Sequence, residues 1–170
     1  MGELGSAPVP EPGDDDHQRG GEAPDAPVVI LYADFECPFC AALHARLDQL
    51  PARLVFRHFP VHSSHPRAWP AACAAEAAGR QGRFWEMHDA LFADPARLED
   101  PHLWDRARAL GLDLARFDAD RHSDTVRARV KRDFRAGVRA GVVTTPTVFT
   151  AGSLYAGRLA EPALARLAAR

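Results

Sequence analysis

Two cysteines three positions apart, Cys37 and Cys40, are the residues of this 170-residue chain whose type and spacing best suit chemistry. Residues three apart on a helix share a face, so the two thiols can meet within one helical turn. Their Cα atoms then lie within the roughly 4.4–6.8 Å that a disulfide accepts. We therefore predict a pair that alternates between dithiol and disulfide, with Cys37 as the attacking thiolate and Cys40 as the resolving thiol.

The sequence around the pair predicts the elements that would position it. The apolar run Val28–Leu31 lacks polar alternation, which is typical of a strand buried on both faces. Pro38 suits the first turn of a helix because its missing N–H would be unpaired there in any case. Cys37 is thus predicted at the N-terminus of a helix, where exposed N–H groups and the helix dipole lower thiol pKa values to roughly 3.5–7.5.

Length and composition are ordinary for one globular domain, with 46% apolar and 26% charged residues. The formal net charge of −2 gives no electrostatic reason to expect nucleic acid as a partner. No run approaches the ~18 consecutive apolar residues of a membrane span, so a membrane is not expected as a partner either. The N-terminal residues lack the basic and apolar regions of a secretory signal. We therefore expect a cytoplasmic protein, or a periplasmic or extracytoplasmic one if the true start lies upstream.

The predicted elements follow the order βαβ, then a block of helices, then ββα, which indicates an α/β sheet with a helical insertion. Residues 26–62 and 142–170 carry the strand patterns, and residues 63–141 carry helical patterns. In that insertion, an alanine-rich helix over residues 68–78 is predicted to end at Gly79. Residues 1–25 are rich in Gly, Pro and acidic residues and are predicted to be a mostly disordered tail, in which residues 16–20 could add a short edge strand.

Four separated motifs in this order resemble the DsbA-like branch of the thioredoxin superfamily. They are Tyr32-x-Asp34-Phe35-Glu36-Cys37-Pro38-Phe39-Cys40, Arg57-His58-Phe59-Pro60, Phe84-Trp85-Glu86-Met87-His88-Asp89 and Thr145-Pro146-Thr147. With the similar opening Asp16-His17-x-Arg19-Gly20, the resemblance covers roughly residues 16–170. It implies a thioredoxin-like α/β fold (βαβ … ββα) with an inserted helical domain. It also implies that Cys37 and Cys40 are a redox-active pair, and that Thr145-Pro146 lies beside them with a cis peptide bond.

The function that this resemblance implies is a protein-disulfide oxidoreductase, which exchanges disulfides with protein or small-thiol substrates through its Cys-Pro-Phe-Cys pair. No cofactor beyond these cysteines is expected. The implied partners are client proteins and a thiol redox partner, either glutathione or a thioredoxin-type system. A cis proline at Pro146 would leave the backbone of Thr145 free to pair with an extended substrate peptide. Phe35 and Phe39, which flank the cysteines, are predicted to stay partly exposed as a substrate-contacting patch.

Two acidic residues next to the pair, Asp34 and Glu36, are candidate modulators of its reactivity. As a like charge, Glu36 would raise the pKa of Cys37; as a proton acceptor, it would assist transfer to or from Cys40; it could also be only an exposed acid. Asp34 could bond the backbone or the buried thiol. Strongly oxidising relatives have Pro-His between the cysteines, so the Pro-Phe of this chain predicts a less oxidising disulfide. Relatives also commonly have Asn-Gly where this chain has Ala151-Gly152.

Three alternatives stay open on the sequence alone. The pair could be half of a zinc site, but zinc needs four ligands and only Cys73 and His44 are stray candidates, so no metal is expected. Cys73 itself lies in the alanine-rich helix and is predicted to be a small buried apolar group. Glutathione-dependent transferases and isomerases also use DsbA-like folds, but they typically present a single serine at this site. A non-catalytic, protein-binding thioredoxin-like module is the third alternative.

Overall fold

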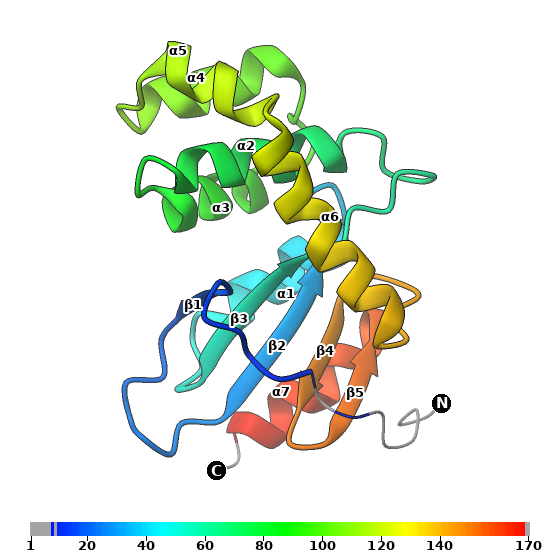
Figure 1. Ribbon diagram of the computed structural model, residues 1–170. Helices are drawn as coiled ribbons and strands as arrows, with labels where there is room; N and C mark the ends of the chain where they lie inside the picture. The colour runs from blue at the N-terminus through cyan, green and yellow to red at the C-terminus, as the bar shows by residue number, and fades with distance from the viewer. Residues whose placement is uncertain (1–7, 9, 169–170) are drawn as a thin grey trace.

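The computed structural model describes residues 8 and 10–168, and Figure 1 shows a sheet with helices on both faces and a stack of helices beyond one end. The sheet has five strands in the order β1-β3-β2-β4-β5. β2 and β3 run parallel, whereas the other neighbouring pairs are antiparallel. The strands are β1 (His17–Arg19), β2 (Val28–Ala33), β3 (Arg53–His58), β4 (Thr147–Thr150) and β5 (Ser153–Ala156).

The helices complete the predicted βαβ and ββα units of a thioredoxin-like α/β fold. α1 (Pro38–Leu47) and α7 (Ala160–Ala168) cover one face of the sheet, and a 3₁₀ turn, η1 (Gly157–Leu159), leads into α7. The helical insertion contains α2 (Ala68–Gly79), α3 (Phe84–Ala93), α4 (Asp100–Ala109) and α5 (Leu114–Arg121). α6 (Asp124–Arg139) then runs from the insertion across the other face of the sheet (Figure 1). Among the described residues, no helix is both long and apolar enough to span a bilayer.

β2 is buried on both faces because its apolar side chains alternate between two hydrophobic clusters. Val29, Leu31 and Ala33 face the cluster that the sheet shares with α1, α7 and the helical insertion. Ile30 and Tyr32 face the cluster beneath α6. A sheet covered on both sides thus explains the unbroken apolar run that predicts this strand.

α6 approaches the sheet most closely at Gly137. A Cβ atom at this position would lie 2.7 Å from Cδ2 of Phe59 and 3.0 Å from Cδ1 of Tyr32. Phe134, one turn earlier on α6, stacks on Phe59 with ring centroids 4.6 Å apart. The glycine therefore lets the aromatic side chains of the sheet pack directly against the helix backbone.

α2 ends at Gly79, where the sequence predicts its end. A Cβ atom at Gly79 would lie 3.3 Å from Cβ of Phe84, which makes this glycine also a point of close packing between α2 and the start of α3. In the turn that follows, Gly82 has a φ of 74°. The Arg83 N–H then donates to the carbonyl of Ala78 at 2.9 Å, closing the helix end.

The edge strand that is predicted over residues 16–20 of the N-terminal tail is present as β1 (His17–Arg19). β1 pairs with the outer edge of β3. Asp16 accepts hydrogen bonds from Arg57 at 3.1 and 2.7 Å, and the Asp15 carbonyl accepts one from Arg129 of α6 at 2.9 Å. These polar contacts hold a segment that has little apolar surface to bury. The prediction for residues 1–7 and 9 falls outside the described residues.

The turn between β4 and β5 places an alanine in a left-handed conformation. Thr150 pairs with Ser153, and the two loop residues between them, Ala151 and Gly152, have φ values of 46° and 79°. Two positive φ values are what a type I′ hairpin turn requires. An ordinary L-residue adopts this conformation at a cost of roughly 1–2 kcal/mol, whereas asparagine tolerates it better.

Replacing Ala151 with asparagine is therefore expected to raise the free energy of unfolding by roughly 0.5–1 kcal/mol. Urea denaturation of the two proteins measures the difference. Gly152→Ala is the matched control with the opposite expected sign, because it adds a Cβ at a φ of 79°. A loss of stability in Ala151→Asn would contradict the assignment of strain to Ala151.

Candidate active site

Cys37 lies where β2 has ended and α1 begins. It is the N-cap residue of α1, in an extended conformation, and Pro38 takes the first helical position. The side chain of Cys40 is one turn further along, and the Cys40 N–H donates to the Cys37 carbonyl at 3.1 Å. Cys37 is 2% exposed and Cys40 is fully buried, with both present as free thiols. The predicted strand-to-helix position of the pair is therefore the one observed.

The surroundings of the two thiols assign them different protonation states. The pKa of Cys37 falls from the usual 9.0 to about 6, chiefly because the Cys40 thiol hydrogen-bonds to its sulfur. Burial opposes this fall, and the N–H groups of Cys40 and Phe39 and the side chain of Thr145 support it. The pKa of Cys40 lies well above its usual value because the thiol is buried and faces the Cys37 sulfur. At neutral pH the pair is thus a thiolate at Cys37 and a thiol at Cys40.

The loop that precedes β4 brings a distant part of the chain against Cys37. The Sγ atom of Cys37 lies 3.5 Å from the carbonyl oxygen of Thr145. The Thr145–Pro146 peptide bond is cis. The loop is anchored on both sides, because Thr147 Oγ1 donates to the Thr144 carbonyl at 2.7 Å and the Gly157 N–H donates to the Pro146 carbonyl at 2.7 Å. Two of the predicted site residues, Thr145 and Pro146, are therefore next to the nucleophile.

A groove lies beside the cysteine pair, between α1, the loop at Pro146 and the start of α7. Its volume is about 210 Å³. Phe39 forms part of its wall and is 43% exposed, which fits the predicted contact with substrate. Arg158 places its guanidinium carbon 4.9 Å from the centroid of the Phe39 ring. The groove is lined by Phe39, Ala42, Leu43, Pro146, Gly157, Arg158, Ala160 and Glu161.

Phe35 does not belong to this exposed patch, and its predicted contact with substrate is wrong. The side chain is 1% exposed. Its ring packs 5.5 Å from the centroid of Phe56 and 4.7 Å from that of Phe92, on the side of the sheet that faces the helical insertion. Phe35 therefore supports the turn before Cys37 from within the core.

Asp34 fastens the turn before the cysteines to the loop that follows β3. Its buried carboxylate accepts the Glu36 N–H at 2.8 Å and the Val61 N–H at 2.9 Å, and Nδ1 of His65 lies 2.8 Å from it. Of the two predicted roles of Asp34, bonding to the backbone is therefore present. Its negative charge also adds to the raised pKa of Cys40.

Glu36 is paired rather than merely exposed. The Arg67 N–H donates to one carboxylate oxygen at 2.7 Å, and Nε of Arg67 donates to the other at 2.8 Å. Neither Arg67 nor Arg158 was reachable from the sequence motifs, because each meets its partner across elements that are far apart in the chain. No pattern of neighbouring residues in the sequence predicts a pairing of this kind.

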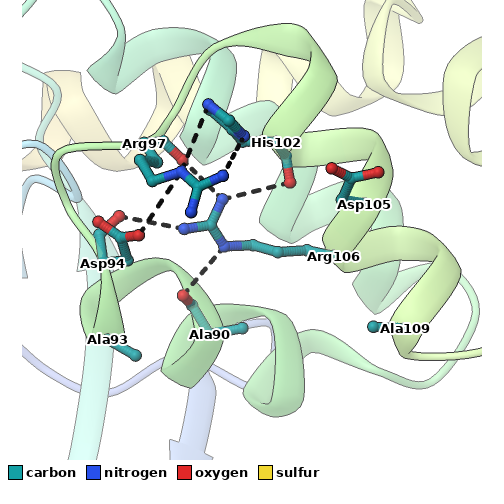
Figure 2. A pocket seen from close by; sticks show the side chains of 8 residues that line it. All are labelled: Ala90, Ala93, Asp94, Arg97, His102, Asp105, Arg106 and Ala109. Carbon is teal, nitrogen blue, oxygen red and sulfur yellow. Dashed lines mark hydrogen bonds and ion pairs between the residues drawn. The ribbon is translucent and has the colours of Figure 1, made fainter.

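A larger cavity, of about 400 Å³, lies in the helical insertion between α3 and α4 (Figure 2). Arg106, which is half-buried in its wall, donates from Nε to the Ala90 carbonyl at 3.0 Å and from Nη2 to the Asp94 carbonyl at 3.0 Å. Nη1 donates to the carbonyls of Arg97 and His102 at 2.6 and 3.2 Å. Arg106 is thus committed to tying α3, the following loop and α4 together, and the cavity shares no residue with the cysteine site.

Two groups of histidine and carboxylate side chains have the types and spacing of metal ligands. One joins His17, His58 and Glu76, and the other joins His44, His88 and Asp89. In these groups, Nδ1 of His58, Nδ1 of His44 and Nε2 of His88 are buried without a hydrogen-bond partner. A metal would bind the ring nitrogen that faces the carboxylate, so the ring proton would have to sit on the other, unpartnered nitrogen. In metal-bound histidines that second nitrogen normally donates its proton to an acceptor, and these histidines have none there. Direct contacts between histidines and carboxylates therefore fit both groups better: hydrogen bonds at His17, His58 and His88, and an ion-pair contact of 3.4 Å at His44.

The third cysteine, Cys73, lies on α2 away from the pair. It is buried, and burial raises the pKa of its thiol to about 11. A thiol that stays protonated at neutral pH is a poor nucleophile. Cys73 is therefore the small apolar group that the alanine-rich helix predicts, and neither histidine group includes a cysteine.

Comparison with known proteins identifies both a family and a fold. A family model described as thioredoxin matches residues 15–167. A solved thioredoxin-like oxidoreductase from Silicibacter pomeroyi DSS-3 superposes with a TM-score of 0.80 at 24% identity, covering 91% of each chain. The thiol-disulfide exchange protein alpha-DsbA2 from Wolbachia pipientis superposes with a TM-score of 0.74 at 19% identity, covering 88% of this chain and 86% of that one. The fold is therefore DsbA-like.

Curated relatives carry names of a different kind. Over 151 residues, the chain is 42% identical to the Na(+)/H(+) antiporter NhaA 1 of Mycolicibacterium gilvum (strain PYR-GCK), covering 84% of this chain and 24% of that protein. The Na(+)/H(+) antiporter NhaA of Herminiimonas arsenicoxydans is 42% identical over 149 residues, covering 84% of this chain and 23% of that protein. The chain thus spans about a quarter of the length of the curated relatives it matches.

Proposed function

This chain belongs to the thioredoxin family, and from that premise we propose that it is a thiol–disulfide oxidoreductase working through Cys37 and Cys40. The observation that carries the proposal is the placement of the pair: Cys37 is the N-cap residue of α1, Cys40 lies one turn further on, and the Thr145 carbonyl is 3.5 Å from the Cys37 sulfur. This surrounding lowers the pKa of Cys37 to about 6 and raises that of the buried Cys40. A thiolate is the species that attacks a disulfide, and a neighbouring thiol is the group that resolves the product. A structural disulfide or an inert pair would need neither.

The proposed reaction moves two electrons in two displacement steps. The Cys37 thiolate attacks one sulfur of a substrate disulfide, so a Cys37–substrate disulfide forms and the other substrate sulfur leaves as a thiolate that takes up a proton. Cys40 then gives up its proton and attacks the Cys37 sulfur. The Cys37–Cys40 disulfide forms, the second substrate sulfur leaves, and the substrate has been reduced at the expense of the protein dithiol. The reverse sequence oxidises a substrate dithiol.

The substrates proposed are proteins with an extended, partly apolar segment beside the reacting cysteine. The groove next to Cys37 has an apolar wall with Phe39 and Pro146, and Arg158 and Glu161 at its rim are charged. An extended peptide along the Thr145–Pro146 loop would place its own sulfur near the Cys37 thiolate. A thiol redox partner, glutathione or a thioredoxin-type protein, would return the pair to its starting state.

The reduction potential proposed for the Cys37–Cys40 disulfide lies between those of strongly reducing and strongly oxidising proteins of this kind. A pKa of about 6 for Cys37 is above the roughly 3.5 of the most oxidising proteins of this kind and below the roughly 7 of thioredoxin. Stabilising the thiolate stabilises the reduced form, so the potential is expected between about −270 and −120 mV. Phe39 in place of a histidine between the cysteines supports the same intermediate position.

The names of the curated relatives support a second, narrower candidate. We propose that the chain, or a longer protein that contains it, exchanges disulfides with the cysteines of a membrane transporter. The specific observation is that 84% of this chain aligns with only 24% of a protein named as a sodium–proton antiporter. The thiol-exchange region of such proteins would then act on the remainder or on a separate transporter chain.

Replacing Cys40 with serine is expected to trap substrates on Cys37. Without the resolving thiol the Cys37–substrate disulfide persists, so adducts that disappear on reduction should accumulate in cells and be visible on non-reducing gels. Mass spectrometry then identifies the trapped proteins, and transporters among those in the membrane fraction would support the narrower candidate. The Cys37→Ser/Cys40→Ser double variant is the control. Equal adducts in both variants would refute the proposed function.

A further inference from the structure

The residue immediately before the nucleophile carries a charge that should oppose its reactivity. Glu36 precedes Cys37 directly in the chain. A like charge at short range disfavours the ionised form of an acid, so a free Glu36 carboxylate would raise the pKa of Cys37. The Cys37 thiolate is nevertheless the favoured form at neutral pH. How strongly Glu36 opposes the thiolate therefore depends on the groups that surround its carboxylate.

The groups that lower the pKa of Cys37 most are neutral hydrogen-bond partners, so a counter-charge for the Glu36 carboxylate has to lie elsewhere. They are the Cys40 thiol, the N–H groups of Cys40 and Phe39, and the Thr145 side chain. The charged or titratable side chains around the Glu36–Cys37 turn are Asp34 with His65, Cys40, Glu36 with Arg67, Glu99 beyond Arg67, and Arg158 over the Phe39 ring.

Arg67 binds both oxygens of the Glu36 carboxylate. Its backbone N–H donates to Oε2 at 2.7 Å, and its Nε donates to Oε1 at 2.8 Å, with Nη2 also 2.8 Å from Oε1. The Glu36 side chain is 9% exposed and the Arg67 side chain 35% exposed, so water reaches the pair from the arginine side. Arg67 is also the N-cap residue of α2, and the N-terminus of that helix adds its partial positive charge.

Arg67 is held from its other side by the helical insertion. Its Nη1 donates to the Ala96 carbonyl at 2.9 Å and to Oε1 of Glu99 at 2.6 Å. Glu99 is the N-cap residue of α4. The guanidinium is therefore fixed between the turn before Cys37 and the loop before α4. Pairing with a different anion would break several of these hydrogen bonds.

We propose that Arg67 is a positioning residue of the redox site: by clamping the Glu36 carboxylate from the helical insertion, it cancels the charge that would otherwise destabilise the Cys37 thiolate. This inference rests on the proposed function, because it concerns the reactivity of the same pair. Arg67 touches neither the cysteines nor a substrate, and acts through Glu36.

The redox consequence follows from the reduction of the Cys37–Cys40 disulfide by two molecules of glutathione. The protein S–S bond breaks, one S–S bond forms in oxidised glutathione, and the protein is left with a thiolate at Cys37, a thiol at Cys40 and one proton released to solvent. A less stable thiolate shifts this balance toward the protein disulfide. Losing Arg67 should therefore make the protein harder to reduce.

Arg67→Gln is the variant that tests the proposal. We expect the midpoint of the Cys37 thiolate titration, followed by absorbance at 240 nm, to rise by roughly one pH unit. A midpoint raised from about 6 to about 7 lowers the equilibrium constant for reduction by glutathione roughly fivefold at pH 7. Arg83→Gln is the matched control, because Arg83 is also an N-cap arginine paired with a glutamate, Glu86, and should leave both readings unchanged.

Removing both charges separates an electrostatic role from a merely structural one. The Glu36→Gln/Arg67→Gln double variant should restore the wild-type midpoint, since neither charge is left. Glu36→Gln alone should lower the midpoint, and this variant keeps the test available if Arg67→Gln does not fold. An unchanged midpoint in Arg67→Gln or in Glu36→Gln, or a double variant that keeps the full shift, would overturn the proposal. Wild-type protein that never forms the Cys37–Cys40 disulfide with glutathione would instead refute the proposed function.

Discussion

Replacing Cys37 with serine is expected to eliminate disulfide turnover, leaving only the uncatalysed rate of the added reductant. Cys37 is the one cysteine of the chain whose pKa is lowered, while those of Cys40 and Cys73 are raised. A serine hydroxyl neither ionises at neutral pH nor forms a disulfide. Reduction of a model disulfide in the presence of glutathione measures the effect. Cys73→Ala, which changes a buried thiol on α2, is the matched control and should retain wild-type turnover.

Wild-type turnover no faster than that of Cys37→Ser would refute the proposed enzyme. Glutathione that binds tightly without oxidising the pair would favour the transferase or isomerase alternative. Zinc in the purified protein, together with blocked thiols, would favour the non-catalytic alternative. The three readings of the sequence are thus separated by one set of measurements.

The lowered pKa of Cys37 also predicts how the reduced protein responds to pH. Alkylation of Cys37 should rise tenfold per pH unit in acid and level off above about pH 6. The folded pKa is lower than the unfolded one, so the stabilisation is complete above the usual value of 9.0 and is lost as the pH falls through about 6. Between pH 5 and pH 8 the reduced protein should gain roughly 2–3 kcal/mol from this group. Urea denaturation of reduced wild-type and Cys37→Ser proteins checks the difference.

The largest expected loss of stability from a single polar replacement is at Glu76 of α2. One oxygen of this buried carboxylate lies 2.8 Å from Nε2 of His17 on β1 and 2.7 Å from Nε2 of His58 on β3. Nε of Arg129 on α6 is 3.8 Å away. The contacts with His17 and His58 hold the pKa of Glu76 far below its usual value despite burial. The carboxylate therefore joins the helical insertion to two strands and to the helix that crosses the sheet.

Glu76→Gln is expected to cost roughly 3 kcal/mol, because an amide keeps the shape but loses the charge that both histidines and Arg129 face. The midpoint temperature of thermal unfolding should fall by roughly 6–12 °C for a chain of this size. The control is Glu86→Gln, which removes an exposed carboxylate paired with Arg83 and should change stability by less than about 0.5 kcal/mol. Equal losses in both variants would contradict a special role for Glu76.

The pH dependence of this difference has a definite sign. The pKa of Glu76 is lower in the folded protein, so its stabilisation is complete above the usual value of 4.5 and declines as the pH falls toward the lowered value. The difference in the free energy of unfolding between the wild-type protein and Glu76→Gln should therefore be largest near neutral pH and become smaller in acid. A gap that widens in acid would contradict the assigned charge.

Local patterns were sufficient for the parts of the fold that depend on local interactions. The apolar run Val28–Leu31 predicted a doubly buried strand, and Pro38 predicted the helix that starts after Cys37. The position of Phe35 could not be predicted in the same way. Phe35 lies just beyond the end of β2, where the alternation of side chains along the strand no longer predicts which face of the sheet a residue occupies. Its position is set by contact with Phe92 of the helical insertion.

Contacts between distant elements also explain features that local patterns do not show. Gly79 ends α2 as the sequence predicts, and the approach of Phe84 adds a packing role that its residue type does not reveal. Composition predicted a mostly disordered tail in which residues 16–20 could add an edge strand; that strand is present as β1, and Asp16 beside it is held by Arg57 from β3. Arg67 stands 31 residues after Glu36, and no motif spans that gap.

The short strand β1 also protects the sheet from other copies of the protein. The middle of β3 is the apolar run Leu54–Phe56, and its outer edge would offer unpaired N–H and C=O groups if β1 were absent. Exposed apolar edges of this kind seed strand addition and aggregation. β1 occupies that edge with three polar residues, and Gly20 and Gly21, at φ values of 72° and 63°, turn the chain away directly afterwards. The segment before the first buried strand thus acts as a cap against edge-to-edge association.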